Sequence, residues 1–310
     1  MMSLPYKFGP RRPPTFGIMI IITGATGQLG QQVITALRQQ LPADQIVAFV
    51  RDTARATKQL GTDIQVRTGE FTQPQKLETT FSGAAQVLIV SVDKVGEVAT
   101  DMHRAAIRAA RAAGVGRNLY TSHQGARLNS PFAAAHDHAV TEGFLADGTT
   151  PFTALRHGFY AESALHMVGA GLRGGELRVP EDGPISWTAR DDLAAADAAI
   201  LARPGRIDGV SPPLTGMQTY TMSDLARLAS EESGREIKHV TVTDEEWLTA
   251  TQARGVPEIY ARMLLGTFLA ARRADFALTD PTLQKLIGRP PLGMREILRD
   301  FLREPHAAGH

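Results

Sequence analysis

The stretch that decides the fold lies at residues 18–30, where Ile18-Met19-Ile20-Ile21-Ile22 is followed by Thr23-Gly24-Ala25-Thr26-Gly27-Gln28-Leu29-Gly30. A short continuous apolar run is typical of a parallel strand that is buried on both faces. The loop after it has the spacing G-x-x-G-x-x-G: Gly24 permits a sharp turn, Gly27 lets backbone N–H groups approach a pyrophosphate, and Gly30 lets a helix pack closely on the strand. The stretch therefore predicts a dinucleotide-binding βα unit, and a glycine-rich turn without a ligand is the alternative interpretation.

Strands and helices alternate along the chain that follows. Apolar runs predict strands at 45–50, 86–91, 117–122 and 152–156, and helical patterns lie at 31–40, 74–81, 100–113, 133–146 and 193–201. This alternation predicts an α/β fold, a Rossmann-type doubly wound parallel sheet with ligands at the carboxyl ends of its strands. From residue 211 the pattern changes to a smaller α+β region, with helices at 221–233, 244–253 and 257–273 and a strand at 237–242.

The same patterns divide the chain into three parts. Residues 1–17 contain four prolines and no periodicity, so we expect a flexible leader there. Residues 18–150 are expected to form the NAD(P)-binding Rossmann domain. Residues 151–310 are expected to complete the sheet and to add a smaller region beside the substrate cleft.

Composition excludes several classes of function. The 33 Lys and Arg residues nearly balance the 32 Asp and Glu residues, so the chain has no overall field that would attract nucleic acid. The absence of cysteine excludes disulfides, thiolate metal sites and cysteine nucleophiles. The sequence has no apolar run long enough for a membrane span and no signal-peptide pattern, so we expect a cytoplasmic protein that binds neither nucleic acid nor a membrane.

The residue after the second expected strand selects between the two nicotinamide cofactors. That residue is Arg51, and a guanidinium at this place suits the 2′-phosphate of NADPH. Two alternatives remain open. Arg51 could pair with Asp52 as a solvated charge, and Asp52 could turn toward the ribose and admit NAD(H).

Several motifs in a fixed order resemble the NmrA-like family of atypical short-chain dehydrogenase/reductases, and most closely its NAD(P)H:quinone oxidoreductase and flavin-free azo reductase type. The resemblance covers about residues 18–302. Its motifs are Ile22 to Gly30 with Val50-Arg51, Ala113-Gly114-Val115, Tyr120-Thr121-Ser122, His138 with Glu142 and Leu145, Leu155-Arg156-His157-Gly158-Phe159-Tyr160-Ala161-Glu162, Asp191 to Ala196, and Leu286 to Pro291.

The resemblance implies where NADPH binds. It places the cofactor along the glycine loop, with Arg51 near the 2′-phosphate and with Ser91 and Val92 beside the adenosine or ribose. The nicotinamide end is placed near residues 157–162. The residues implied in cofactor binding are Gly24, Thr26, Gly27, Gln28, Leu29, Gly30, Arg51, Ser91, Val92, His157, Gly158, Phe159, Tyr160 and Glu162.

The chain lacks the Tyr-x-x-x-Lys of ordinary short-chain dehydrogenases, in which Tyr is the general acid. In the helix expected to carry that motif, Ala134 takes the place of the Tyr and His138 that of the Lys. Our candidate proton donors are His138, whose ordinary pKa is near neutral, then Tyr160 and Ser122. The simpler roles are a helix-packing hydrogen bond for His138, a cavity wall for Tyr160 and a strand-end hydrogen bond for Ser122.

The lack of the Tyr-x-x-x-Lys motif favours a reductase of strong hydride acceptors. A quinone or azo group accepts hydride readily, so its reduction depends mainly on correct positioning beside the nicotinamide. We therefore expect an NADPH-dependent oxidoreductase that reduces a small aromatic acceptor without flavin, as a monomer or homodimer. The alternative is a redox-sensing regulator that binds NAD(P) without turnover. No metal site is expected, since His136 and His138 point to opposite sides of a helix.

Overall fold

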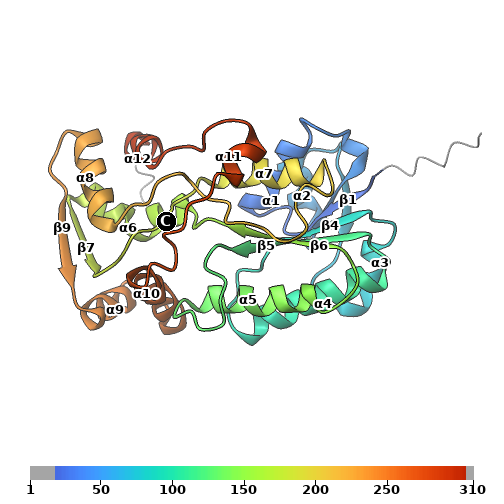
Figure 1. The fold of residues 1–310 in the computed structure, drawn as a ribbon, viewed down its shortest axis with the longest axis horizontal. Helices are drawn as coiled ribbons and strands as arrows, with labels where there is room; N and C mark the ends of the chain where they lie inside the picture. Colours follow the sequence, from blue (N-terminus) through green and yellow to red (C-terminus); the bar gives the residue numbers. More distant parts are fainter. Residues whose placement is uncertain (1–17, 305–310) are drawn as a thin grey trace, which may run out of the picture.

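The computed structural model describes residues 18–304 and is built on a seven-stranded parallel sheet in the order β3-β2-β1-β4-β5-β6-β8 (Figure 1). Strand order reverses next to β1, as in a doubly wound sheet, so the predicted Rossmann-type fold is confirmed. The strands are β1 (Ile20–Ile22), β2 (Ile46–Val50), β3 (Gln65–Thr68), β4 (Gln86–Ile89), β5 (Arg117–His123), β6 (Phe152–His157) and β8 (Gly209–Val210).

Helices cover both faces of this sheet (Figure 1). One layer consists of α1 (Gln28–Leu37), α2 (Thr53–Leu60), α7 (Arg190–Leu201) and α11 (Thr282–Ile287), and the other of α3 (Pro74–Phe81), α4 (Glu97–Ala112) and α5 (Ala133–Ala146). Ile20 and Ile22 belong to the core under the first layer and Ile21 to the core under the second. The apolar run of β1 is therefore buried on both faces, as its sequence predicts.

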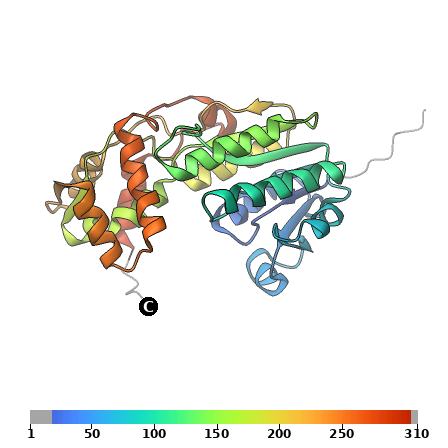
Figure 2. The same ribbon diagram turned by 90° about the horizontal axis from the view of Figure 1, so that it is seen from below.

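A smaller region lies beyond the carboxyl ends of the central strands, at the left of Figure 1 and Figure 2. Its two-stranded parallel sheet pairs β7 (Glu176–Pro180) with β9 (Lys238–Val242). Around it lie α6 (Ala161–Gly174), α8 (Met222–Ser233), α9 (Asp244–Ala253), α10 (Glu258–Arg272) and α12 (Met294–Arg303). A third apolar core holds this region together. Because the ligand edge of the sheet faces it, this region is placed to form a wall of the site.

Some elements differ from the sequence prediction. Helix α1 begins three residues earlier than expected, at Gln28, because Gly27 is its N-cap and Gly30 lies inside its first turn. No strand is predicted at 65–68, because β3 is an edge strand with exposed polar ends rather than an apolar run. Helix α6 was also missed, because its three glycines weaken the helical pattern.

Two further findings concern the predicted parts of the chain. The expected leader, residues 1–17, lies outside the described residues. Within residues 18–304, none of the helices combines the length and the apolar character needed to cross a membrane.

Candidate functional site

The glycine loop is packed so tightly that side chains would not fit. Gly24 has a φ of +58°, and its carbonyl oxygen accepts a hydrogen bond of 2.8 Å from the N–H of Gly27. A Cβ on Gly30 would lie 2.8 Å from the carbonyl carbon of Gly24 and 2.9 Å from Cα of Ala25. These are backbone atoms that cannot rotate away. The first turn of α1 is thereby held directly against the loop, with its N-terminus available to an anion.

Arg51 follows the last residue of β2 and is exposed. Its neighbour Asp52 is the N-cap of α2, where its carboxylate accepts a hydrogen bond of 3.0 Å from the N–H of Arg55. This contact occupies the carboxylate, and among the described residues Arg51 forms no ion pair. The geometry therefore favours Arg51 as a phosphate ligand over the Asp52 alternative.

Arg55 is a second cation at this end of the loop, which the sequence reasoning missed. Its Nη2 lies 3.5 Å from the carbonyl oxygen of Thr26, one of the loop residues. The signal for it was Asp52, a typical N-cap residue that starts a helix at Thr53. The first turn of this helix carries Arg55 back toward the glycine loop. Two guanidinium groups thus lie near the outer part of the predicted cofactor site.

The loop after β4 is fixed by hydrogen bonds to its neighbours. The N–H of Ser91 donates to Oγ1 of Thr121 at 2.8 Å, and the N–H of Val92 donates to Nε2 of His103 at 3.0 Å. The N–H of Val90 donates to Oγ1 of Thr23 at 2.8 Å. These contacts tie the predicted adenosine-side loop to the glycine loop and to helix α4.

A small cavity of about 170 Å³ lies beyond these strand ends. It brings together all three candidate proton donors, Ser122, His138 and Tyr160, with four residues predicted to bind the cofactor, Ser91, His157, Gly158 and Phe159. The remaining lining residues are His123, Phe132, Ala134 and Ser163. Val92 and Glu162 do not line it, since Val92 is bound to His103 and the Glu162 carboxylate accepts a hydrogen bond of 3.0 Å from the N–H of Arg190.

A larger groove of about 910 Å³ adjoins this cavity and shares Phe132, Phe159 and Ser163 with it. Gln28 of the glycine loop opens onto the groove, as do Glu162 and Arg190. Its far walls come from α6, β7, α9 and α10, with apolar side chains such as Trp247. The groove therefore leads from the loop, past the small cavity, to the C-terminal region.

The hydrogen bonds around His138 favour a hydrogen on its Nε2. His103 accepts at Nε2 from Val92, so its Nδ1 is the donor, 3.1 Å from Thr141 Oγ1 and 3.4 Å from Tyr120 Oη. Because His103 Nδ1 cannot accept, we assign the Tyr120 hydroxyl as the donor to Nδ1 of His138, at 2.7 Å. The hydrogen of His138 is therefore on Nε2, to which no described residue is hydrogen-bonded.

Burial changes the expected role of His138. Loss of hydration lowers the pKa of His138 well below its usual value, and the neighbouring histidines lower it further. The ring is thus neutral at neutral pH, which corrects the expectation of a pKa near neutrality. Burial likewise raises the pKa of Tyr120 above its usual range, so this hydroxyl keeps its proton. His138 can therefore offer a fixed N–H donor to the cavity rather than a mobile proton.

The hydroxyl hydrogen of Ser122 is already used in a hydrogen bond within the protein, so it is not available to an acceptor in the cavity. Its hydroxyl donates to Oε1 of Glu142 at 2.6 Å, and Glu142 is held by the guanidinium of Arg156 at 2.9 and 2.7 Å. The Ser122 hydrogen is therefore directed away from the cavity. This contact corresponds to the strand-end hydrogen bond that was the simpler role for Ser122.

Tyr160 and His157 meet a buried carboxylate that the sequence reasoning did not single out. The Oη of Tyr160 lies 3.4 Å from Nδ1 of His157, whose Nε2 lies 2.8 Å from Oδ1 of Asp197 on α7. Burial raises the pKa of Tyr160, so this hydroxyl is protonated at neutral pH. Asp197 lies in the apolar second half of α7, AAADAAIL, and the one acid in that half was the available signal.

Among residues 18–304, no group of three or more His, Asp or Glu side chains is arranged to hold a metal ion. His136 faces outward, where its Nδ1 lies 3.4 Å from Oδ1 of Asp137.

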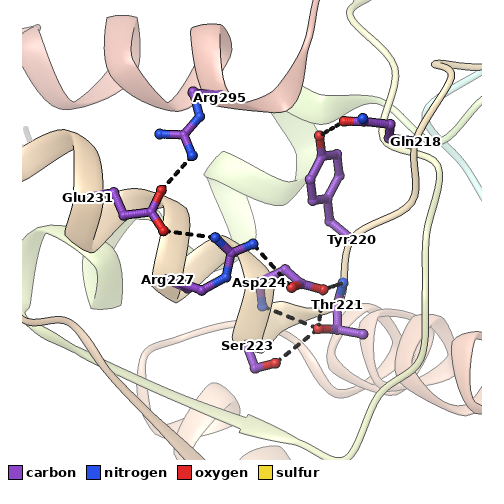
Figure 3. Close-up of polar contacts among 8 residues, drawn as sticks. All are labelled: Gln218, Tyr220, Thr221, Ser223, Asp224, Arg227, Glu231 and Arg295. Atoms are coloured by element: carbon purple, nitrogen blue, oxygen red, sulfur yellow. Dashed lines mark hydrogen bonds and ion pairs between the residues drawn. The ribbon is translucent and has the colours of Figure 1, made fainter.

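A second depression of about 870 Å³ lies between α8 and α12, and its polar groups are paired with one another (Figure 3). Arg227 lies 2.8 Å from Glu231 and 3.5 Å from Asp224. Arg295 forms an ion pair with the same Glu231 at 2.5 Å. Because each of these guanidinium groups already faces a carboxylate, this depression is a weaker anion site than the glycine loop.

Comparison with known proteins supports the resemblance predicted from the sequence. The model of the NmrA-like family matches residues 18–280. Quinone oxidoreductase 2 of Escherichia coli is 36% identical over 279 residues, which are 90% of this chain and 96% of that protein. NAD(P)H azoreductase of Xenophilus azovorans is 28% identical over 88% of this chain and 94% of its own. The crystal structure of the E. coli NADPH-dependent quinone oxidoreductase QOR2 with NADPH matches with a TM-score of 0.86 at 34% identity, covering 92% of this chain and all of that one.

Proposed function

Because the chain belongs to the NmrA-like family, we propose that it is an NADPH-dependent oxidoreductase that passes hydride directly to a quinone-like or azo acceptor, without flavin. One observation carries the proposal. The tight glycine loop opens onto the groove that adjoins a cavity in which His138 and Tyr160 meet the predicted nicotinamide-binding residues, and Arg51 forms no ion pair with any of the described residues. The relatives named above act on quinones or azo compounds with NAD(P)H, and the acceptor chemistry is transferred from them.

The residues present fit NADPH. The loop from Gly24 to Gly30 leaves the space that a pyrophosphate needs, at the N-terminus of α1. Arg51 and Arg55 supply cations for the 2′-phosphate. The residues from His157 to Tyr160 line the cavity where the nicotinamide would lie. Ser91, expected beside the adenosine or ribose, lines the same cavity, which places it nearer the nicotinamide than the sequence indicated. When bound, the cofactor supplies the hydride.

The protein's own contribution is orientation and hydrogen bonding. The Nε2–H of neutral His138 can donate to a carbonyl or azo group of the acceptor, or to the ribose. Phe132 and Phe159 pack against each other and form an apolar wall of the cavity, suited to an aromatic acceptor. In the proposed division of labour, residues 18–150 bind the cofactor, and the part after 150 supplies the groove that admits an aromatic acceptor. NADPH consumption fits the cytoplasmic location predicted from the sequence.

The test is steady-state oxidation of NADPH, followed by the absorbance of the reduced nicotinamide, with flavin-free protein and a panel of quinones and azo dyes. We expect multiple turnovers with at least one acceptor. Tight NADPH binding with no oxidation by any acceptor would contradict the proposal and favour the redox-sensing alternative. Oxidation that requires added flavin would contradict the direct transfer of hydride.

A further inference from the structure

The pair formed by His157 and Asp197 is buried, and among residues 18–304 it forms no ion pair with any other side chain. His157 is 1% exposed and Asp197 is fully buried. Nε2 of His157 is 2.8 Å from Oδ1 of Asp197, while the second carboxylate oxygen, Oδ2, has no hydrogen-bond partner. A carboxylate in this position has lost its hydration and has gained one hydrogen bond in return.

This arrangement determines how many protons the pair holds. A neutral imidazole beside an ionised carboxylate would leave an uncompensated negative charge in an apolar site, which is a costly state. The two remaining states, an imidazolium beside a carboxylate or an imidazole beside a carboxylic acid, are both neutral overall. Each contains one proton more than the same two side chains hold in water at neutral pH. Burial also raises the pKa of Asp197, in agreement with this count.

The groups around the pair do not supply the missing positive charge. His123 and His138 lie across the cavity, and burial lowers the pKa of each, to about 3 for His123, so both rings are neutral. The guanidinium of Arg190 lies 5.1 Å above the ring of Tyr160, but it is 4.0 Å from the carboxylate of Glu162. The extra proton is therefore the simplest way to neutralise Asp197.

The proton has a path to the cavity. In both neutral states Nδ1 of His157 carries a hydrogen and faces Oη of Tyr160 at 3.4 Å. Tyr160 lines the cavity, so its own hydrogen is free to point at a bound acceptor. A two-electron reduction of a quinone or azo group by hydride needs one proton to complete it.

We propose that His157 and Asp197 together store one proton at neutral pH and deliver it, through Tyr160, to the acceptor reduced in the cavity. This inference rests on the proposed function. The acceptor gains a hydride and becomes an anion, and its oxygen or nitrogen takes the proton of Tyr160 Oη. Tyr160 is reprotonated from Nδ1 of His157. The pair is left with one negative charge until water returns a proton after product release. His157 and Asp197 are thus positioning and proton-supplying residues, and Tyr160 is the catalytic donor.

The first experiment does not depend on turnover. NMR of protein labelled with ¹⁵N in histidine and ¹³C in the aspartate carboxyl groups, with signals assigned from His157→Asn and Asp197→Asn, reports where the proton is. At neutral pH we expect either an imidazolium signal for residue 157 or a carboxylic acid signal for residue 197. A neutral imidazole beside an ionised carboxylate would overturn the proposal, whether or not the protein reduces any acceptor.

The second experiment measures kcat against pH with an active quinone. We expect the wild type to lose activity at high pH as the pair loses its proton. Asp197→Asn should lower kcat by roughly tenfold or more, within the range of general acid catalysis, and move this loss to lower pH, with KM for NADPH within about twofold of wild type. Tyr160→Phe, at the cavity surface, should lower kcat and abolish the loss of activity at high pH, and it serves if Asp197→Asn does not fold.

The matched control is Asp192→Asn, on the same helix. Asp192 is also buried, but it faces Arg289 at 2.6 Å and accepts from the N–H of Leu292 at 2.6 Å, away from the cavity. We expect this variant to lose stability while keeping the wild-type pH profile. If Asp197→Asn and Asp192→Asn both keep that profile, the His157–Asp197 pair is structural and the proposal is wrong.

Discussion

The substitution Gly30→Ala tests the tight packing of the glycine loop. A Cβ at residue 30 would meet the Gly24 carbonyl carbon at 2.8 Å and Ala25 Cα at 2.9 Å, whereas carbon atoms pack best at about 3.5 Å or more. The loop would have to move by roughly 0.6 Å or more. Overpacking of this kind costs about 1–3 kcal/mol, and alanine recovers about 1 kcal/mol as the better helix former. We expect a net loss of up to about 2 kcal/mol in the free energy of unfolding.

The same movement displaces the backbone N–H groups that are proposed to bind the pyrophosphate. Loss of one hydrogen bond to a charged group costs about 1.5–3 kcal/mol, so we expect Kd for NADPH to rise by about 10- to 100-fold. Fluorescence titration with NADPH and thermal unfolding measure the two effects. Gly143→Ala, on α5, is the matched control, because a Cβ there meets nothing within 4 Å. A Gly30→Ala protein with an unchanged Kd would refute the assignment of this loop to the cofactor.

Three further predictions concern other parts of the site. Arg51→Ala should raise KM for NADPH by about 10- to 100-fold and leave KM for NADH unchanged, since it removes a charge-assisted contact to the 2′-phosphate. Lys58 is an exposed cation on α2, and the control variant Lys58→Ala should change neither KM. Tyr120→Phe should lower kcat about tenfold, because His138 loses the hydrogen bond that fixes its Nε2–H form, and an unchanged kcat would show that this orientation does not matter. His103→Gln should reduce the pH dependence of stability measured by urea unfolding. Burial lowers the pKa of His103 from 6.5 to about 4, so between these pH values the ring is protonated in the unfolded chain and neutral in the folded one. The wild type therefore loses stability as the pH falls from about 6.5 to about 4. A variant as acid-sensitive as the wild type over that range would contradict this explanation.

The sheet and the glycine loop could be predicted because their signals are local. An apolar run, three glycines at fixed spacing and alternating helix patterns lie within a few residues of one another, and Ile20, Ile21 and Ile22 are buried as their pattern predicts. The edge strand β3 and helix α6 could not be predicted in this way. They depend on pairing and packing that a local pattern does not show: β3 pairs with β2, and α6 packs against α12, which lies near the end of the described chain.

In the cavity, too, the residues could be predicted from local sequence, whereas their protonation states could not. Ser122, His138 and Tyr160 were identified from their places in the sequence, and the fold brings them together. Their protonation states could not be predicted, because these depend on burial and on partners such as Tyr120 and Asp197. Asp197 is 40 residues from His157 in the sequence, and only the packing of α7 against the sheet makes it a neighbour.

The most direct test of the account is a single-turnover measurement with flavin-free protein, bound NADPH and a quinone in excess, using NADPH deuterated at either face of the nicotinamide C4. We predict that the absorbance of the reduced nicotinamide disappears in an amount equal to the bound cofactor, and that deuterium slows this loss on one face alone. Such a result would show hydride transfer within this cavity. NADPH that stays reduced in the presence of every acceptor, or a rate that is the same for both deuterated forms and for ordinary NADPH, would contradict the account.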